Sequence, residues 1–106
     1  MIYTIHTTVT APNEMYHAVH AELLKRSGGA IDGLLVHLAW PTPTGFRIVE
    51  VWTSKQARDQ CEKELVEPAR MAVTGPAPAQ PGLVPQITTE ELELNGLIIP
   101  AANIAK

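Results

Sequence analysis

LLVHLAWPTPTGFRIVEVW, residues 34–52, is the stretch of sequence that decides the fold. Two apolar runs, 34–40 and 46–52, flank a segment of proline, threonine and glycine at 41–45. Short apolar runs joined by such a turn predict an antiparallel β-hairpin. Neither run alternates cleanly between apolar and polar residues, which indicates that both faces of the sheet are covered. One helical layer covers only one face, so we expect the other face to pack against a second copy of the chain.

Upstream of the hairpin, residues 2–10 are rich in β-branched side chains and predict a strand. In residues 13–26, Met15, Val19 and Leu23 recur at four-residue spacing, which is typical of one face of a helix. The glycines at 28 and 29 favour the left-handed backbone that ends many helices. The sequence therefore predicts a strand followed by a helix before the hairpin begins.

Downstream of the hairpin, residues 53–56 (TSKQ) have the form of a capping box with Thr53 as the N-cap. A second helix is expected to follow, and its buried stripe consists of Ala57, Cys61, Leu65 and Ala69. Pro68 is expected to kink or end this helix. Residues 74–85 hold four prolines and two glycines and predict a loop. Residues 86–94 predict the last strand, which 97–99 extend.

The resulting order, strand–helix–strand–strand–helix–strand, predicts an α+β fold. It is the ferredoxin-like βαββαβ arrangement, with a four-stranded antiparallel sheet packed on two helices. We expect a single domain over residues 1–100 and a C-terminal tail over 101–106. A chain of 106 residues is long enough for one such domain.

Composition narrows the classes of function. The chain is 45% apolar and 18% charged, and its net charge is −3 with eight lysines and arginines that form no basic run. Nucleic acid and membranes are therefore not expected as partners. Cys61 is the single cysteine, and the first residues lack the features of a signal peptide. A cytoplasmic location is the natural expectation.

The hairpin also carries a resemblance to a known family. Residues 33–37, 41–45, 46–52 and Ser54, with the flanking segments 12–16 and 65–68, resemble the small proteins grouped with the antibiotic biosynthesis monooxygenases. These belong to the dimeric α+β barrel superfamily. The resemblance implies a homodimer formed through the sheet face and a hydrophobic small-molecule substrate. It also implies a monooxygenase that works without a cofactor.

His37 and Glu50 are the candidate catalytic residues. His37 is a lone imidazole in an apolar run, and Glu50 is a lone acid in the facing run. If Trp40 pairs with Phe46, His37 lies opposite Val49, and a shift of one residue places it opposite Glu50. A neighbouring carboxylate fixes the tautomer of an imidazole and raises its basicity, as a general base requires. The alternatives are a buried neutral histidine and an ion pair of Glu50 with Arg47 across the dimer interface.

Three further residues are candidates for substrate binding: Trp52, Tyr16 and Arg47. Trp52 and Tyr16 would line the cavity between sheet and helices, where Arg47 would balance charge; core packing is the alternative for Trp52. His17 and His20 stand three apart on the first helix, but no third ligand is placed beside them, so no metal site is expected. Cys61 lies on the buried stripe and is interpreted as a small core residue.

The sequence is compatible with three functions. The first is a cofactor-independent monooxygenase acting on an aromatic or enolisable small molecule, with His37 as the base. The second is a cyclase, isomerase or lyase that uses the same base without oxygen. The third is a non-catalytic protein that binds a small molecule, with haem as one variant.

Overall fold

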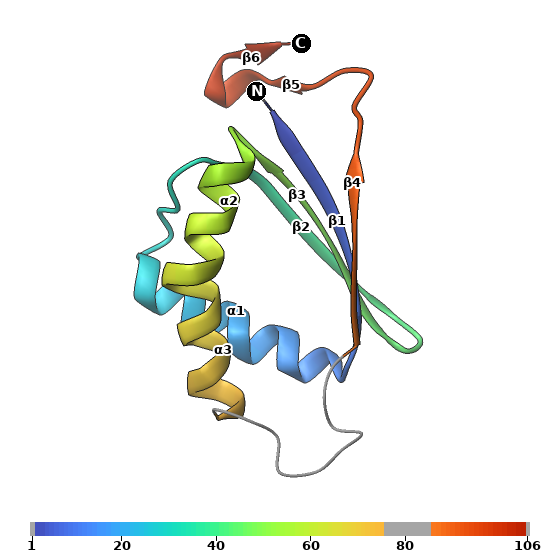
Figure 1. The fold of residues 1–106 in the computed structure, drawn as a ribbon, viewed down its shortest axis with the longest axis vertical. Coiled ribbons are helices and arrows are strands. Elements are labelled where there is room, and N and C mark those ends of the chain that lie inside the picture. Colours follow the sequence, from blue (N-terminus) through green and yellow to red (C-terminus); the bar gives the residue numbers. More distant parts are fainter. Residues whose placement is uncertain (1, 76–85, 106) are drawn as a thin grey trace.

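The computed structural model describes residues 2–75 and 86–105 of the chain (Figure 1). Strand β1 (Tyr3–Thr10) and helix α1 (Asn13–Ser27) precede the hairpin of β2 (Leu34–Thr42) and β3 (Gly45–Trp52). A helical rod follows, made of α2 (Lys55–Cys61), a π-helical segment (Glu62–Val66) and α3 (Glu67–Thr74). Strand β4 (Gln86–Leu92) completes the sheet, so the α+β prediction with a ferredoxin-like order of elements is confirmed.

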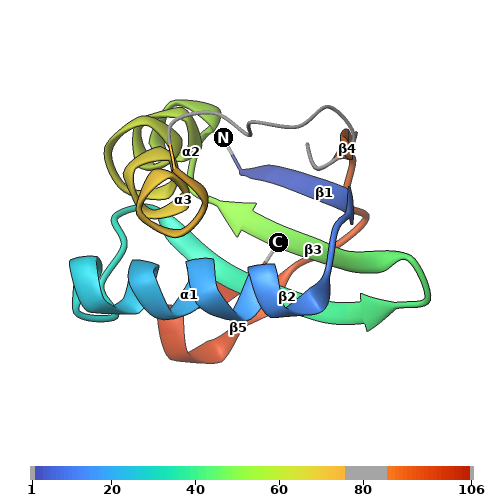
Figure 2. The ribbon, with the colours of Figure 1, turned by 90° about the horizontal axis from the view of Figure 1, so that it is seen from below.

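The four strands form one antiparallel sheet in the order β2-β3-β1-β4. Successive side chains of a strand point to opposite faces. Phe46, Ile48 and Glu50 therefore share the face that is covered by the helices, and Arg47 and Val49 lie on the other face. Figure 2 shows the rod nearly end on and α1 from the side, so the two helical units cross the same face of the sheet in different directions.

Helix α1 keeps its predicted limits within one residue, and Gly28 ends it in the left-handed conformation at φ 67°. The start of the second helix differs from the prediction. Ser54, not Thr53, is the N-cap, and its hydroxyl accepts a hydrogen bond from the Ala57 amide at 3.1 Å. Ser54 has the extended backbone that an N-cap needs, which places its oxygen over the first free amides of the helix.

Pro68 does not end the second helix, which continues to Thr74. The residues before it, Glu62–Val66, form a π-helical turn. A π turn widens the helix locally, and proline lacks the amide proton that a regular helix would use. The wider turn and the position of Pro68 at the start of α3 let the rod pass the proline without a break.

The C-terminal segment also differs from the prediction. Residues 98–99 do not extend β4: β5 (Ile98–Ile99) pairs with β6 (Ile104–Ala105) in a separate two-stranded hairpin. A short 3-10 turn (Pro100–Ala102) joins them, and Asn103 adopts a left-handed backbone there. The residues predicted as a tail are therefore largely ordered as a hairpin. Most of the loop predicted for 74–85 lies outside the described residues.

The buried core gathers where the rod meets the sheet. Trp52, Ile5 and Cys61 form its central cluster, and Ala69 of the rod is also fully buried. Gly45 opens β3 with its backbone so close to the Val9 carbonyl that no side chain fits between them. By contrast, α1 has no fully buried residue, because its apolar face borders a cavity. No helix within residues 2–75 and 86–105 is long and apolar enough to span a membrane.

Candidate functional site

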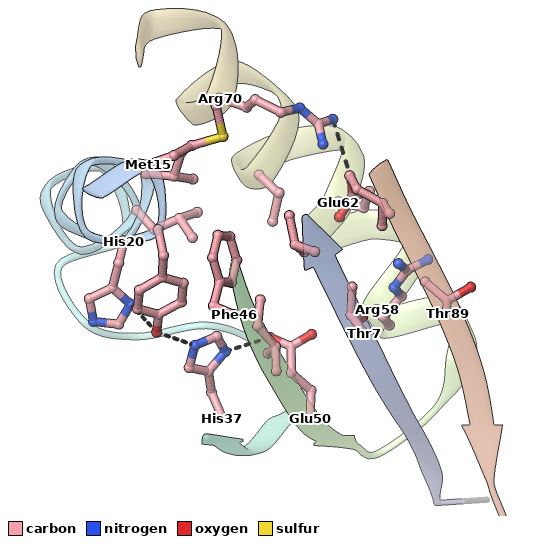
Figure 3. A pocket seen from close by; sticks show the side chains of 17 residues that line it. Thr7, Met15, His20, His37, Phe46, Glu50, Arg58, Glu62, Arg70 and Thr89 are labelled. Atoms are coloured by element: carbon pink, nitrogen blue, oxygen red, sulfur yellow. Dashed lines mark hydrogen bonds and ion pairs between the residues drawn. The ribbon is translucent and has the colours of Figure 1, made fainter. Parts of the chain in front are cut away.

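A cavity of about 170 Å³ lies between the sheet and the two helical units (Figure 3). A cavity of roughly 150 Å³ holds a benzene molecule, so this one has room for a small aromatic compound. Its wall is mostly apolar and includes the stripe predicted on the first helix, Met15, Val19 and Leu23. The polar side chains of the lining are Thr7, Tyr16, His20, His37, Glu50, Arg58, Glu62, Arg70 and Thr89.

His37 and Glu50 meet in this cavity. The hairpin places His37 of β2 directly opposite Glu50 of β3, the shifted one of the two registers considered from the sequence. The His37 Nδ1 and Glu50 Oε2 atoms are 2.7 Å apart, and the two side chains are only 21% and 23% exposed. A bulge between Leu34 and Val36 accompanies this register. The pair is therefore held by backbone pairing on the face covered by the helices.

Tyr16 extends the pair from the neighbouring helix. Its hydroxyl lies 2.7 Å from His37 Nε2 and 3.2 Å from His20 Nδ1. Tyr16 and His20 are four residues apart on α1, so they share one face of the helix. Burial and then the negative charge of Glu50 raise the pKa of the Tyr16 phenol, which keeps it protonated at neutral pH. Both ring nitrogens of His37 are thus engaged in hydrogen bonds.

Burial, followed by the nearby imidazoles of His37 and His17, lowers the pKa of His20 below its usual value. His20 is therefore neutral at pH 7. The contact of His20 with Tyr16 was not predicted from the sequence. His20 was considered there only together with His17, as two ligands of a metal site that was not expected. In the structure His17 lies beside Asn13, with its Nε2 atom 3.1 Å from the Asn13 amide nitrogen. Within the described ranges, no group of three or more metal-binding side chains is found.

Trp52 does not line the cavity. It is only 2% exposed and packs in the core with Ile5 and Cys61. Its indole Nε1 nevertheless lies 3.4 Å from Glu50 Oε1, the carboxylate oxygen that does not face His37. The structure thus places Trp52 behind the candidate base, where the indole N–H helps to orient the carboxylate.

Arg47 lies apart from this site. It is exposed on the opposite face of the sheet, across from Trp40 of β2 and Thr8 of β1. The cations that border the cavity are instead Arg58 and Arg70 of the helical rod, and Arg70 lies 3.6 Å from Glu62. The sequence carries a signal for them. Arg58, Glu62, Val66 and Arg70 recur every four residues, one position after the buried stripe that begins at Ala57.

Cys61 is a buried thiol next to this site, and we expect it to be unreactive. Burial, with smaller contributions from Glu50 and Glu62, raises the pKa of Cys61 from an ordinary 9.0 to about 11. A rise of this size lowers the thiolate fraction at pH 8 by about 100-fold. Reaction with Ellman's reagent should therefore be at least that much slower in the native protein than in urea. Equal rates in the two states would contradict this placement.

No protein-family model matches the chain, and the comparison with curated proteins also gives no match. Solved structures do share its fold. A candidate antibiotic biosynthesis monooxygenase from Caulobacter crescentus CB15 is 17% identical, with a TM-score of 0.58 over 88% of this chain and 91% of that chain. One from Deinococcus radiodurans is 21% identical, with a TM-score of 0.54 over 93% and 99% of the two chains.

SnoaB, a cofactor-independent oxygenase from Streptomyces nogalater, is 12% identical, with a TM-score of 0.56 over 89% of this chain and 91% of that chain. A protein of unknown function from Nitrosomonas europaea is also similar, at 16% identity and a TM-score of 0.59 over 93% and 97%. The resemblance noted in the hairpin is therefore confirmed in the fold. Identities this low show a shared fold and leave the reaction to be argued from the site.

Proposed function

We propose that this protein is an enzyme that removes a proton from a small aromatic or enolisable compound. The observation that carries the proposal is the hydrogen-bonded His37–Glu50 pair in the wall of a largely apolar cavity. Acid–base groups that are hydrogen-bonded to one another in a concave, largely apolar site are typical of catalysis. The pair acts as the base, and the apolar walls hold the substrate beside it.

The chemistry follows from the surroundings of the pair. The Glu50 carboxylate has one oxygen on His37 and the other turned toward Trp52 and the cavity, while Tyr16 occupies the far nitrogen of His37. Both groups are thereby fixed in orientation, which is what general-base catalysis requires. In Figure 3 the Glu50 carboxylate faces the interior of the cavity, so it is the member of the pair that is placed to reach a substrate proton.

Two reactions start from the same step. In the first, the carbanion left on the substrate gives an electron to O₂, and the enzyme is a monooxygenase without a cofactor. The fold shared with the oxygenase SnoaB favours this reaction. In the second, the carbanion is protonated at another position or expels a leaving group, and the enzyme is an isomerase, cyclase or lyase. The requirement for oxygen separates the two.

Proton abstraction is testable without knowing the natural substrate. We expect the purified protein to catalyse exchange of deuterium from D₂O into the acidic C–H positions of 2-tetralone or anthrone, followed by NMR. Oxygen uptake measured in parallel assigns the reaction to the oxygenase class when it accompanies turnover. His37→Ala should lower the exchange rate by about 10²-fold or more, because the carboxylate loses its partner. An unchanged rate in this variant would contradict the assignment.

The non-catalytic alternative predicts binding without exchange. Haem, as one variant, would need a histidine nitrogen that is free to bind iron. Both nitrogens of His37 are hydrogen-bonded, so Tyr16 would first have to move away. The site therefore supports an acid–base role for His37 better than an axial ligand.

The proposed assembly is a homodimer formed through the face of the sheet opposite the helices. Leu38 and Trp40 of β2 lie on this face and are 58% and 42% exposed. Trp40 stacks on His6 of β1, with ring centroids 6.2 Å apart and an angle of 9° between the planes. A flat apolar surface of this kind is expected to pack against its own copy.

Leu38→Asp tests the homodimer. A buried leucine contributes about 1.5–3 kcal/mol, and symmetry places the substitution in the interface twice. We therefore expect the wild-type protein to sediment as a dimer and the variant as a monomer at the same micromolar concentration. Leu24→Asp, at a leucine of α1 that is 49% exposed, is the matched control and should remain dimeric. A monomeric wild type, or a dimeric Leu38→Asp, would exclude this interface.

A further inference from the structure

We infer that Glu50, His37, Tyr16 and His20 form a chain of hydrogen bonds through which the charge on Glu50 sets the tautomers of both histidines. The inference rests on the proposed function, in which Glu50 takes up a proton, and adds Tyr16 and His20 as positioning residues that hold His37 in the tautomer that donates to Glu50. The contacts along the chain measure 2.7, 2.7 and 3.2 Å. It therefore links four acid–base groups without a gap.

The directions of these hydrogen bonds follow from the number of protons available. When Glu50 is a carboxylate it only accepts, so His37 must donate its Nδ1 proton. The Nε2 atom of a neutral His37 then carries a lone pair and accepts the Tyr16 hydroxyl proton. The Tyr16 oxygen has no second proton to give, so it accepts from His20 Nδ1. The charge on Glu50 thus fixes the tautomer of His20 three groups away.

The chain runs from an inner strand of the sheet to helix α1. Glu50 lies on β3, an inner strand, and His37 lies on β2, the edge strand, whereas Tyr16 and His20 lie on α1, which borders the same cavity. Figure 3 shows this path, with Glu50 facing the cavity, His37 next, and His20 beside α1. Among the described residues, none forms a hydrogen bond with His20 Nε2, so the chain ends at that nitrogen.

Protonation of Glu50 allows the opposite set of directions. A protonated Glu50 can donate to His37 Nδ1, His37 then donates from Nε2 to the Tyr16 oxygen, and Tyr16 donates its hydroxyl proton to His20 Nδ1. Each imidazole carries one proton in both arrangements, so the change of tautomer proceeds by exchange with water and no proton is gained or lost by the histidines.

Such a chain matters because general-base catalysis depends on the orientation of the base. The hydroxyl of Tyr16 occupies His37 Nε2 and so keeps the His37 proton on Nδ1, facing Glu50. His20 holds the Tyr16 oxygen in turn. The chain thus keeps the Glu50 carboxylate in one orientation toward the cavity.

The test is an NMR measurement of histidine tautomers on ¹⁵N-labelled protein above pH 7, with no substrate present. In the wild type we expect His37 and His20 each to carry the proton on Nδ1. Glu50→Met removes the acceptor, so both imidazoles should change to the Nε2 tautomer together. Adding Tyr16→Phe to this variant should abolish the response of His20 and keep that of His37. His17, on the same helix but bonded to Asn13, is the internal control and should not change.

Tyr16→Phe alone provides the second measurement. It should leave the Nδ1 proton of His37 in place and release the tautomer of His20, because the His20 Nδ1 proton loses the Tyr16 oxygen as its acceptor. A His20 tautomer that is unchanged in Glu50→Met, or unchanged in Tyr16→Phe, would overturn the chain. Because these readouts need no substrate, coupled tautomers without turnover would count against the proposed function alone.

Discussion

Glu50→Gln is expected to lower the rate of deuterium exchange into 2-tetralone or anthrone by about 10²–10⁴-fold, the usual contribution of a general base. The amide has nearly the shape of the carboxylate but cannot take up a proton. Its carbonyl oxygen still accepts a hydrogen bond from His37 Nδ1, which lies 2.7 Å from Glu50 Oε2 in the native protein. The effect should therefore appear in the rate of exchange and leave the fold intact.

Arg47→Gln is the matched control for this prediction. Arg47 also lies on β3, three residues earlier, but it is exposed on the opposite face of the sheet. The substitution is of the same kind, from a charged residue to glutamine on the same strand. It should leave the exchange rate unchanged. Circular dichroism and thermal unfolding report whether either variant is folded. A folded Glu50→Gln with wild-type exchange would remove Glu50 from the reaction.

Glu50 and Arg47 show which features of the site can be predicted from the sequence and which cannot. The hairpin was predictable, because turn chemistry and apolar runs are local properties. Two registers were compatible with the sequence, one residue apart, and a shift of one residue moves a strand's side chains to the other face. The observed register puts His37 opposite Glu50. Arg47 lies three residues before Glu50 on the same strand and therefore points to the other face in either register. Predicting Arg47 at the cavity failed because sequence proximity to Glu50 does not give the same face.

Other parts of the site depend on tertiary contacts that no local pattern encodes. The hydroxyl of Tyr16 meets His37 across 21 positions of sequence, and only the packing of α1 over β2 brings them together. Likewise, the cap at Ser54 and the π turn before Pro68 depend on how the rod packs against the sheet. The C-terminal hairpin was missed because its two strands have only two residues each, too few for a periodic signal.

Trp52→Ala is expected to have the largest effect on stability of any substitution considered. The side chain is 2% exposed and packs against Ile5 and Cys61, so its removal leaves a cavity in the centre of the core. Replacement of a buried tryptophan by alanine costs about 3–5 kcal/mol. Small domains are stable by about 5–15 kcal/mol, so the variant should lose a large share of its free energy of unfolding. Urea denaturation followed by circular dichroism measures the loss.

Trp52→Phe separates packing from the contact with Glu50. Phenylalanine retains most of the buried area but lacks the indole N–H that lies 3.4 Å from Glu50 Oε1. We expect a loss of stability smaller than that of Trp52→Ala, and a moderate fall in exchange rate as the carboxylate becomes less well oriented. If Trp52 instead bound substrate directly, Trp52→Phe would raise KM and leave kcat unchanged. A fall in kcat at constant KM therefore identifies Trp52 as a residue that acts through Glu50, from within the core.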